Sequence, residues 1–334
     1  MADYKDIKGG AVQNFAGDPP APIVGQLWYD STASKFEFFS SNPVGAWASG
    51  GTMNTARSGL TGSTGTQTAA IGFGGQTPPN TYVAVTETYD GSSWTEVGDL
   101  NTARYYPAGV GTATAALSAG GGTSGPDNYY TVVEKWNGTA WTEVGDLNTG
   151  APGRYGLGGA GTNTAALVFG GYSTPPATVH DDAETWDGSS WTEIADINTG
   201  RYSISGCGAS NTAALAFAGL TPPVQALTES WNGTAWTEVG DLNTARETAG
   251  GTGTSTAALC VGGHTGPAYV GIVEKWNGTA WTEVADLSAA SGYGVGTAGT
   301  TAAALAFGGR NPTHLATSEE WNEPATATEV ITTS

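Results

Sequence analysis

Short segments of alternating small and apolar positions recur along the chain, and each one ends at a pair of small residues that are mostly glycines. The six segments are TAAIGFGG, TAALSAGGG, TAALVFGG, TAALAFAG, TAALCVGG and AAALAFGG. Alternation of this length that stops at glycine is typical of a buried β-strand followed by a turn. The Thr-, Ser- and Gly-rich sequence around these segments gives long helices little support.

A second phrase follows the first five of these segments. It reads YDGSSWTEVGDLNTAR at 89, WNGTAWTEVGDLNT at 136, WDGSSWTEIADINT at 186, WNGTAWTEVGDLNTAR at 231 and WNGTAWTEVADL at 276. Its second aromatic residue is a tryptophan, and successive copies are 47, 50, 45 and 45 residues apart. This period is too long for ankyrin or tetratricopeptide units, and its strand-like pattern argues against a helical solenoid.

Each repeat predicts four strands. Glycine-rich segments such as SGLTGSTG and YYPAGVGT form first strands around a central channel, and the alternating segments form second strands. The Asn-Gly or Asp-Gly step predicts a type I′ hairpin between the third and fourth strands. A single sheet cannot bury both of its faces, so neighbouring sheets must stack radially with large aromatics between them. These structural aromatics are Trp47, Tyr89, Trp94, Trp136, Trp141, Trp186, Trp191, Trp231, Trp236, Trp276, Trp281 and Trp321.

The pattern resembles the kelch repeat, which combines a double glycine, a spaced aromatic pair and a trailing arginine. The trailing arginine is found in four copies as Arg57, Arg104, Arg201 and Arg246. In a fifth copy three extra residues displace it to Arg154. The resemblance covers residues 47 to about 330 and implies an all-β, six-bladed kelch-type β-propeller. The predicted repeats are 58–104, 105–154, 155–201, 202–246, 247–290 and 291–334.

The last copy, WNEPATATEV, lacks the turn glycine and the second tryptophan. Trp47 precedes Asn54 by the same seven residues that separate Trp94 from Asn101. We therefore expect an N-terminal strand to complete the sixth sheet and close the ring, which leaves no open edge. The alternative is a seven-bladed ring in which LWYD and KFEFF begin an extra blade.

The chain divides into an extended N-terminal attachment arm, residues 1–25, and a propeller, residues 26–334, whose residues 26–57 form a hairpin and the closing strand. The arm contains AGDPPAP, a segment that favours extended backbone. Its first ten residues hold no apolar signal-peptide core. We expect the arm to join the chain to copies of itself or to other proteins.

The net charge of the chain argues against one class of binding partner. The net charge is −19 and the pI is near 4.2, so phosphate backbones are repelled and nucleic acid is not an expected partner. No apolar run is long enough to cross a bilayer, so membrane insertion is not expected. Cys207 and Cys260 lie in strand-like segments and are expected to be small buried residues.

Candidate catalytic chemistry is sparse. The carboxylates of the Trp-Thr-Glu phrase recur in five copies, whereas an active site must break the symmetry of the repeats. The kelch enzyme galactose oxidase needs a copper site and a Tyr–Cys crosslink, and this chain has only three histidines, each from a different repeat. Convergence of the three imidazoles on one metal ion is possible chemically, but separate surface histidines are the expected arrangement. We therefore predict no enzyme activity, no catalytic residue, no metal site and no cofactor.

The loops between second and third strands differ from repeat to repeat, and variable loops on a rigid scaffold are a common binding arrangement. Unconstrained drift of these loops is the alternative explanation. The side chains expected to contact a partner are Tyr82, Tyr129, Tyr130, Tyr172, His180, His264, Tyr269, Arg310 and His314.

Residues 25–51, GQLWYDSTASKFEFFSSNPVGAWASGG, resemble a short module of bacteriophage tail-fibre and other virion proteins. The near-identical kelch copies also resemble those of virion proteins from marine phages. The resemblance implies a non-enzymatic fibre or decoration subunit located in the virion, whose rim recognises a host-surface glycan or protein. The alternative is a secreted or surface-exposed, lectin-like propeller that binds carbohydrate.

Overall fold

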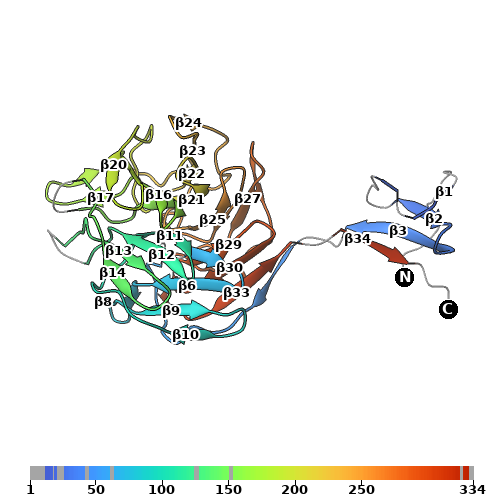
Figure 1. Ribbon diagram of the computed structural model, residues 1–334, viewed down its shortest axis with the longest axis horizontal. Helices are drawn as coiled ribbons and strands as arrows, with labels where there is room; N and C mark the ends of the chain where they lie inside the picture. Colours follow the sequence, from blue (N-terminus) through green and yellow to red (C-terminus); the bar gives the residue numbers. More distant parts are fainter. Residues whose placement is uncertain are drawn as a thin grey trace. The chain divides into compact units, whose positions relative to one another are not determined.

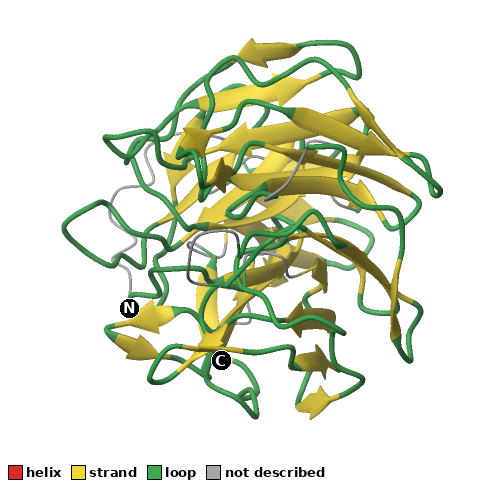
Figure 2. Cartoon of the chain, turned by 90° about the vertical axis from the view of Figure 1, so that its left-hand side faces the viewer, coloured by secondary structure: helices red, strands yellow, loops and turns green. Residues whose placement is uncertain are grey.

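The computed structural model describes residues 12–17, 19–20, 26–41, 45–60, 64–123, 128–149, 153–323 and 326–330. These residues form strands and loops without a helix (Figure 2), so the all-β prediction is confirmed. No helix in this part of the chain could therefore cross a membrane. The chain divides into two compact units, one of residues 1–45 with 323–334 and the other Ala46–Asn322.

Within its described residues, unit Ala46–Asn322 contains six four-stranded sheets, which follow one another in chain order (Figure 1). The sheets are β5 (Thr64–Thr66), β6 (Ala69–Phe73), β9 (Thr86–Tyr89) and β10 (Trp94–Glu96); β11 (Ala108–Thr112), β12 (Ala115–Ala119), β13 (Val133–Trp136) and β14 (Trp141–Glu143); β15 (Gly158–Thr162), β16 (Ala165–Phe169), β19 (Ala183–Trp186) and β20 (Trp191–Glu193); β21 (Ser205–Ser210), β22 (Ala213–Phe217), β23 (Thr228–Trp231) and β24 (Trp236–Glu238); β25 (Gly250–Thr254), β26 (Ala257–Val261), β27 (Val273–Trp276) and β28 (Trp281–Glu283); and β29 (Gly296–Gly299), β30 (Ala303–Phe307), β33 (Ser318–Asn322) and β4 (Ala46–Ser49).

Three short two-stranded ladders extend the loops between second and third strands. They pair β7 (Gln76–Thr77) with β8 (Thr81–Tyr82), β17 (Tyr172–Ser173) with β18 (Thr178–Val179), and β31 (Arg310–Asn311) with β32 (Thr313–His314). Every ladder of the unit is antiparallel.

The first strands of the sheets contact one another in sequence. β5 contacts β11, and the contacts continue through β15, β21, β25 and β29, which in turn contacts β5. A cavity of about 220 Å³ is lined mostly by glycine, alanine and threonine residues of all six first strands, together with Val110 and Cys207. Four-stranded antiparallel sheets arranged in this way are compatible with a β-propeller.

The sixth sheet combines the two ends of the unit. β4 pairs with β33 in the register Trp47↔Trp321, and Figure 1 shows this blue strand beside the red-brown one. The two indole rings are 5.6 Å apart, and Trp47 donates a hydrogen bond from Nε1 to the carbonyl oxygen of Ala285 in the fifth sheet. The strand that contains Trp47 therefore lies where the sequence offset from Asn54 predicted it.

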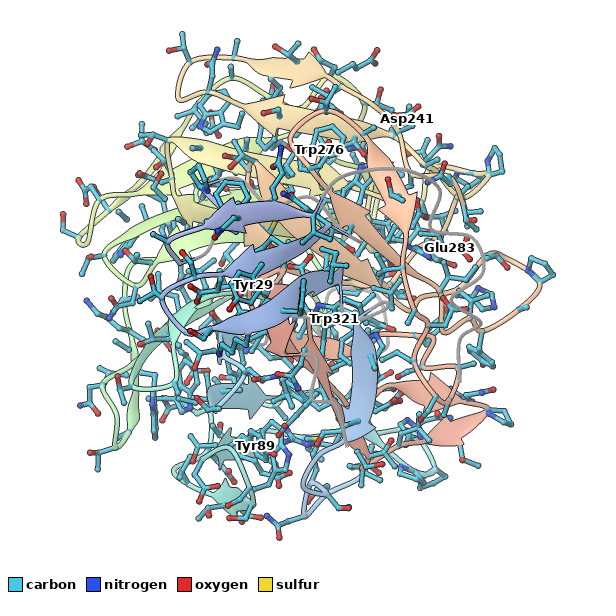
Figure 3. All side chains as sticks on the ribbon, turned by 90° about the vertical axis from the view of Figure 1, so that its right-hand side faces the viewer. Tyr29, Tyr89, Asp241, Trp276, Glu283 and Trp321 are labelled. Carbon is cyan, nitrogen blue, oxygen red and sulfur yellow. The ribbon has the colours of Figure 1, made fainter. Side chains whose placement is uncertain are left out.

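Large aromatic side chains fill the space between sheets. Trp276 and Trp321, both labelled in Figure 3, are about 1% exposed and come from the third strands of the fifth and sixth sheets. Trp141 packs edge-on against Phe73 of the preceding sheet at 4.9 Å, and Trp236 and Trp281 make the same contact with Phe169 and Phe217. Burial of such rings supplies much of the stabilisation between the sheets.

The predicted type I′ hairpins are wrong. Trp136 pairs with Trp141, so four residues form the loop, and Gly138 has a positive φ whereas Asn137 does not. The reason is the Asn137 side chain, whose Oδ1 accepts hydrogen bonds from the backbone N–H groups of Thr139 and Ala140 at 2.9 Å. This Asx turn stabilises the wider loop, and Asp90 forms the same turn in the first sheet.

A buried arginine–glutamate pair is present in five of the six sheets. Arg104 and Glu134 are fully buried, and Nη2 of the arginine is 2.6 Å from Oε1 of the glutamate. Arg104 also donates to the carbonyl oxygens of Gly120 and Val132, which satisfies its guanidinium in the absence of water. The other pairs are Arg57–Glu87, Arg154–Glu184, Arg201–Glu229 and Arg246–Glu274, at 2.6–3.2 Å.

The sixth sheet lacks this arginine. Ser291 occupies the equivalent position and donates from its hydroxyl to the carbonyl oxygen of Gly308. Glu319 accepts a hydrogen bond from the backbone N–H of Ser288 at 2.9 Å, and no cation pairs with it among the described residues. A void of about 10 Å³ lies beside Ser291 and Glu319.

The other unit contains one sheet in the order β1 (Gln13–Phe15), β2 (Leu27–Asp30), β3 (Lys35–Ser41) and β34 (Thr326–Val330). β1 runs parallel to β2, so residues 13–15 of the expected arm belong to a sheet, while residues 1–11, 18 and 21–25 lie outside the described residues. β34 pairs with β3, so 27–41 and 326–330 form this sheet, whereas the sequence analysis assigned both segments to the propeller.

Candidate binding surface

Six isolated backbone bridges connect two kinds of segment in each repeat. Each bridge joins the connection that precedes a first strand to the loop between the second and third strands of the same sheet. The bridges are Ser58↔Gln76, Tyr105↔Gly122, Tyr155↔Tyr172, Tyr202↔Leu220, Glu247↔His264 and Gly292↔Arg310. The variable loops and the connections therefore form one continuous face, which we call the rim.

Tyrosine side chains gather on this rim. Tyr155 is the centre of the group, because its ring centroid is 4.6–6.4 Å from those of five other tyrosines. These five neighbours are Tyr105, Tyr106, Tyr129, Tyr172 and Tyr202. Tyr82 joins through Tyr105 at 4.8 Å. The tyrosines other than Tyr106 are half-buried, so each keeps part of its surface accessible.

Tyr106 links this group to a second one. Its ring is 6.3 Å from that of Tyr293, which contacts His264 and Tyr269. We call the whole set the tyrosine network. Burial raises the pKa of Tyr105, Tyr155 and Tyr293, and the neighbouring phenols of Tyr105 and Tyr155 add to the effect. Their hydroxyls consequently stay neutral at physiological pH and can both donate and accept hydrogen bonds.

The connections also form a circuit of backbone hydrogen bonds. Each of the six connections contains a residue at left-handed φ that accepts or donates such a bond, and the circuit runs from sheet to sheet. The bonds are Tyr106 N→Gly59 O, Gly156 N→Tyr106 O, Ile204 N→Gly156 O, Thr248 N→Ser203 O, Gly294 N→Thr248 O and Leu60 N→Gly294 O, at 2.9–3.4 Å. Because each connection is tied to its neighbours, the rim tyrosines rest on a rigid base.

Tyr106 occupies a special place in this circuit. It has φ of 52°, a conformation that is rare for a large residue, and it is 4% exposed. Its ring lies so close to Gly59 and Gly294 that a Cβ on Gly294 would be 2.8 Å from it. Strained backbone of this kind persists only where the surrounding structure fixes it.

Of the nine rim residues that the sequence predicted, five join the tyrosine network. These are Tyr82, Tyr129, Tyr172, His264 and Tyr269. Tyr130 instead lies over the buried Arg104 guanidinium, 5.5 Å from its centre. Arg310 donates to the carbonyl oxygen of Pro312, and it pairs with His314 across the β31–β32 ladder.

Sequence reasoning missed Tyr105, Tyr106, Tyr155, Tyr202 and Tyr293. The sequence does contain a signal for three of them, since Tyr105, Tyr155 and Tyr202 each directly follow the repeated arginine. The sequence pattern places Tyr105 and Tyr106 in a glycine-rich first strand, whereas both precede β11.

The three histidines have separate surroundings. His180 contacts Ser173 and Asp182, His264 lies 3.6 Å from Glu247, and burial lowers the pKa of His314. In the described part of the chain, no three His, Cys, Asp or Glu side chains are grouped so that they could hold a metal ion. Cys207 and Cys260 are buried free thiols, and burial raises the pKa of both.

The repeated carboxylates have structural surroundings. Glu96 and Glu143 are exposed on fourth strands, and Asp99 accepts the backbone N–H of Thr86. In three other repeats the equivalent backbone N–H donates to Asp196, Asp241 or Asp286.

No protein-family model matches the chain, and a search of curated proteins gives no match.

Proposed function

We propose that the chain is a six-bladed, kelch-type β-propeller that acts as a recognition subunit of a virus particle. Three observations support the closed ring: the contact of β29 with β5, the hydrogen bond from Leu60 to Gly294, and the pairing of β4 with β33. The double glycines, aromatic pairs and trailing arginines support the kelch assignment.

The tyrosine network is the observation that supports a recognition role. Half-buried tyrosines offer large contact area with little loss of conformational entropy on binding, and they are enriched at interfaces. Contacts between neighbouring rings limit their rotamers before a partner arrives, which lowers the cost of binding. The opposite ends of the sheets carry nearly identical hairpins, so the rim is the face on which the repeats differ most.

The virion assignment is supported by the resemblance of residues 25–51 to a tail-fibre module and by the acidic, lysine-poor sequence. On this proposal the chain is a fibre or decoration subunit, and residues 1–25 contribute to its attachment to the particle. Deletion of residues 1–25 should leave a folded Ala46–Asn322 unit that does not enter particles. Normal incorporation of the truncated chain would refute the attachment role.

The recognition role is tested with particles that carry Tyr155→Ala, because this side chain contacts five other tyrosines. We expect host adsorption to fall about tenfold or more, the size of a hot-spot effect. Thr139→Ala, in a hairpin at the other end of the sheets, is the matched control and should adsorb normally. Equal adsorption by both variants would exclude the rim as the recognition face.

The second candidate is a lectin-like propeller outside any particle. The exposed tyrosine faces support it, since ligand sites are commonly lined by aromatic side chains with a few polar groups. Glycan-array binding by the isolated protein, lost in Tyr155→Ala and without association to particles, would favour this function.

A further inference from the structure

The loop between the second and third strands of the third sheet contains three polar side chains in a hydrogen-bonded row. The hydroxyl of Ser173 is 2.7 Å from Nε2 of His180. On the other side of the ring, Nδ1 of His180 is 2.6 Å from Oδ2 of Asp182. A nucleophile, a base within hydrogen-bond reach and a third group that orients the base form the arrangement used in nucleophilic catalysis.

The carboxylate of Asp182 fixes the roles of the two imidazole nitrogens. An ionised carboxylate can only accept a hydrogen bond, so the proton shared with Asp182 resides on Nδ1. In the neutral ring Nε2 is then an acceptor, and the hydroxyl proton of Ser173 points toward it. Asp182 thus holds His180 in the tautomer that can take a proton from Ser173.

This row is absent from the equivalent loops. His180 donates its backbone N–H to Gly171, and the residues that make the same bond in the other sheets are Val83, Tyr130, Gln225, Val270 and Leu315. Asp182 accepts from Gly170, and the residues that accept the same bond elsewhere are Val85, Val132, Leu227, Ile272 and Thr317. The repeat therefore requires neither the imidazole nor the carboxylate, and both occur together with Ser173 in a single sheet.

The row lies beside the tyrosine network. Tyr172 directly precedes Ser173 and contacts Tyr202 at 5.1 Å and Tyr155 at 5.8 Å. Asp182 is 37% exposed and His180 is 13% exposed, whereas Ser173 is 7% exposed. A group that reaches Ser173 must consequently be small, while a larger part of the same molecule can lie over the neighbouring tyrosines.

We propose that Ser173 is a reactive nucleophile that hydrolyses esters of small acyl groups such as acetyl, with His180 as its general base. The Ser173 oxygen bonds to the carbonyl carbon while its proton moves to Nε2 of His180. The bond to the alcohol then breaks, and the alcohol leaves with that proton. Water attacks the acyl-serine with His180 again as base, so that a carboxylic acid and free Ser173 are released. Asp182 acts as a positioning residue.

The test uses the full-length protein and 4-nitrophenyl acetate as the probe, with mass spectrometry to locate the acetyl group. We expect acetyl-Ser173 to form and 4-nitrophenol release to exceed the rate without protein. His180→Gln keeps Ser173 in place and should slow both about 100-fold or more, the usual contribution of a general base. Asp182→Asn should also slow acetylation, and Asp182→Glu should restore part of the rate.

Two controls keep the result interpretable. Asp187→Asn removes an exposed carboxylate from the hairpin of the same sheet without touching Ser173 or the tyrosine network, and it should leave the rate unchanged. Thermal unfolding of each variant reports whether the fold is retained. The proposal is overturned if Ser173 is acetylated no faster than the exposed Ser189 of a hairpin, or if His180→Gln reacts like the unaltered protein. Neither outcome bears on rim recognition, which depends on Tyr155 and is tested separately.

Discussion

Five sheets of the Ala46–Asn322 unit are continuous stretches of chain, whereas the sixth is completed by a strand from the N-terminal side. The five contain a covalent hairpin between third and fourth strands and a buried arginine–glutamate pair. The sixth has neither, since β4 and β33 come from different parts of the chain and Ser291 replaces the arginine.

The difference separates what stabilises the five repeated sheets from what stabilises the sixth. A buried guanidinium needs a carboxylate to offset its charge, and each of the five sheets supplies one. Where β4 pairs with β33, aromatic packing and backbone pairing replace the ion pair. The sixth sheet therefore depends most on Trp47 and Trp321, and the other five depend also on a polar network.

The largest effect is expected from Arg104→Leu. This change removes the only cation that is paired with the buried Glu134 among the described residues, which costs about 3–5 kcal/mol of the free energy of unfolding. Ser291→Ala, at the equivalent position of the sixth sheet, removes one hydroxyl hydrogen bond and should cost about 1 kcal/mol. Denaturant unfolding of both variants measures the difference, and equal losses would show that the ion pair is not what distinguishes the five sheets.

Trp47→Ala should have the next largest effect. Trp47 is half-buried, so we expect a loss of about 2 kcal/mol, below the roughly 3–5 kcal/mol for a fully buried aromatic such as Trp141. Because the change loosens the pairing of β4 with β33, protease should cleave near β4 sooner than in the unaltered protein. A Trp47→Ala chain as stable as the parent would mean that β4 does not hold the sixth sheet.

Glu319→Gln should change stability by less than about 1 kcal/mol, because no cation in the described residues depends on its charge. Glu134→Gln removes the charge that offsets the buried Arg104 and should cost at least about 2 kcal/mol. Thermal unfolding of the two variants at one pH makes the comparison. A larger loss for Glu319→Gln would reverse the proposed distinction between the sheets.

The smallest effect on stability is expected in the hairpins between third and fourth strands, which the sixth sheet lacks. The backbone N–H of Ser93, together with bonds from Ser92, lowers the pKa of Asp90 to about 2 from an ordinary value of 3.8. Its contribution to stability is therefore complete above pH 3.8 and is lost as the pH falls through about 2. Asp90→Asn replaces the carboxylate with the amide that Asn137 uses in the equivalent turn of the second sheet. The free energy of unfolding should then depend less on pH between pH 4 and 2. An unchanged pH profile would contradict this origin.

Much of the strand order follows from the sequence. The alternating segments and the aromatic phrase predicted the second, third and fourth strands, and the distance from Trp47 to Asn54 predicted the strand that completes the sixth sheet. These features depend on local patterns and on the fixed period of the repeat. The hairpin type was not predictable from Asn-Gly alone, because the side chain of Asn137 stabilises a wider loop.

The interior ion pairs and the rim were predicted only in part. Glu134 is a charged residue in a short strand, and by itself this favours a solvent-facing position. Only the structure shows that it pairs with Arg104, which is 30 residues away in the chain. Tyr105 and Tyr155 belong to different repeats, so only the folded chain brings their rings to 5.6 Å. The sequence does not predict the Ser173–His180–Asp182 row, because only the folded loop brings the Ser173 hydroxyl to the His180 ring.

Closure of the ring by the N-terminal strand is the central claim, and disulfide trapping tests it most directly. Ala48 and Glu320 are direct partners of β4 and β33, so cysteines at these positions lie within disulfide range. The native Cys207 and Cys260 are buried and do not compete. We predict an intramolecular disulfide in Ala48→Cys/Glu320→Cys and none in Ala48→Cys/Ser230→Cys, whose second cysteine occupies the same position in the fourth sheet. No disulfide in the first variant, or equal trapping in both, would contradict closure.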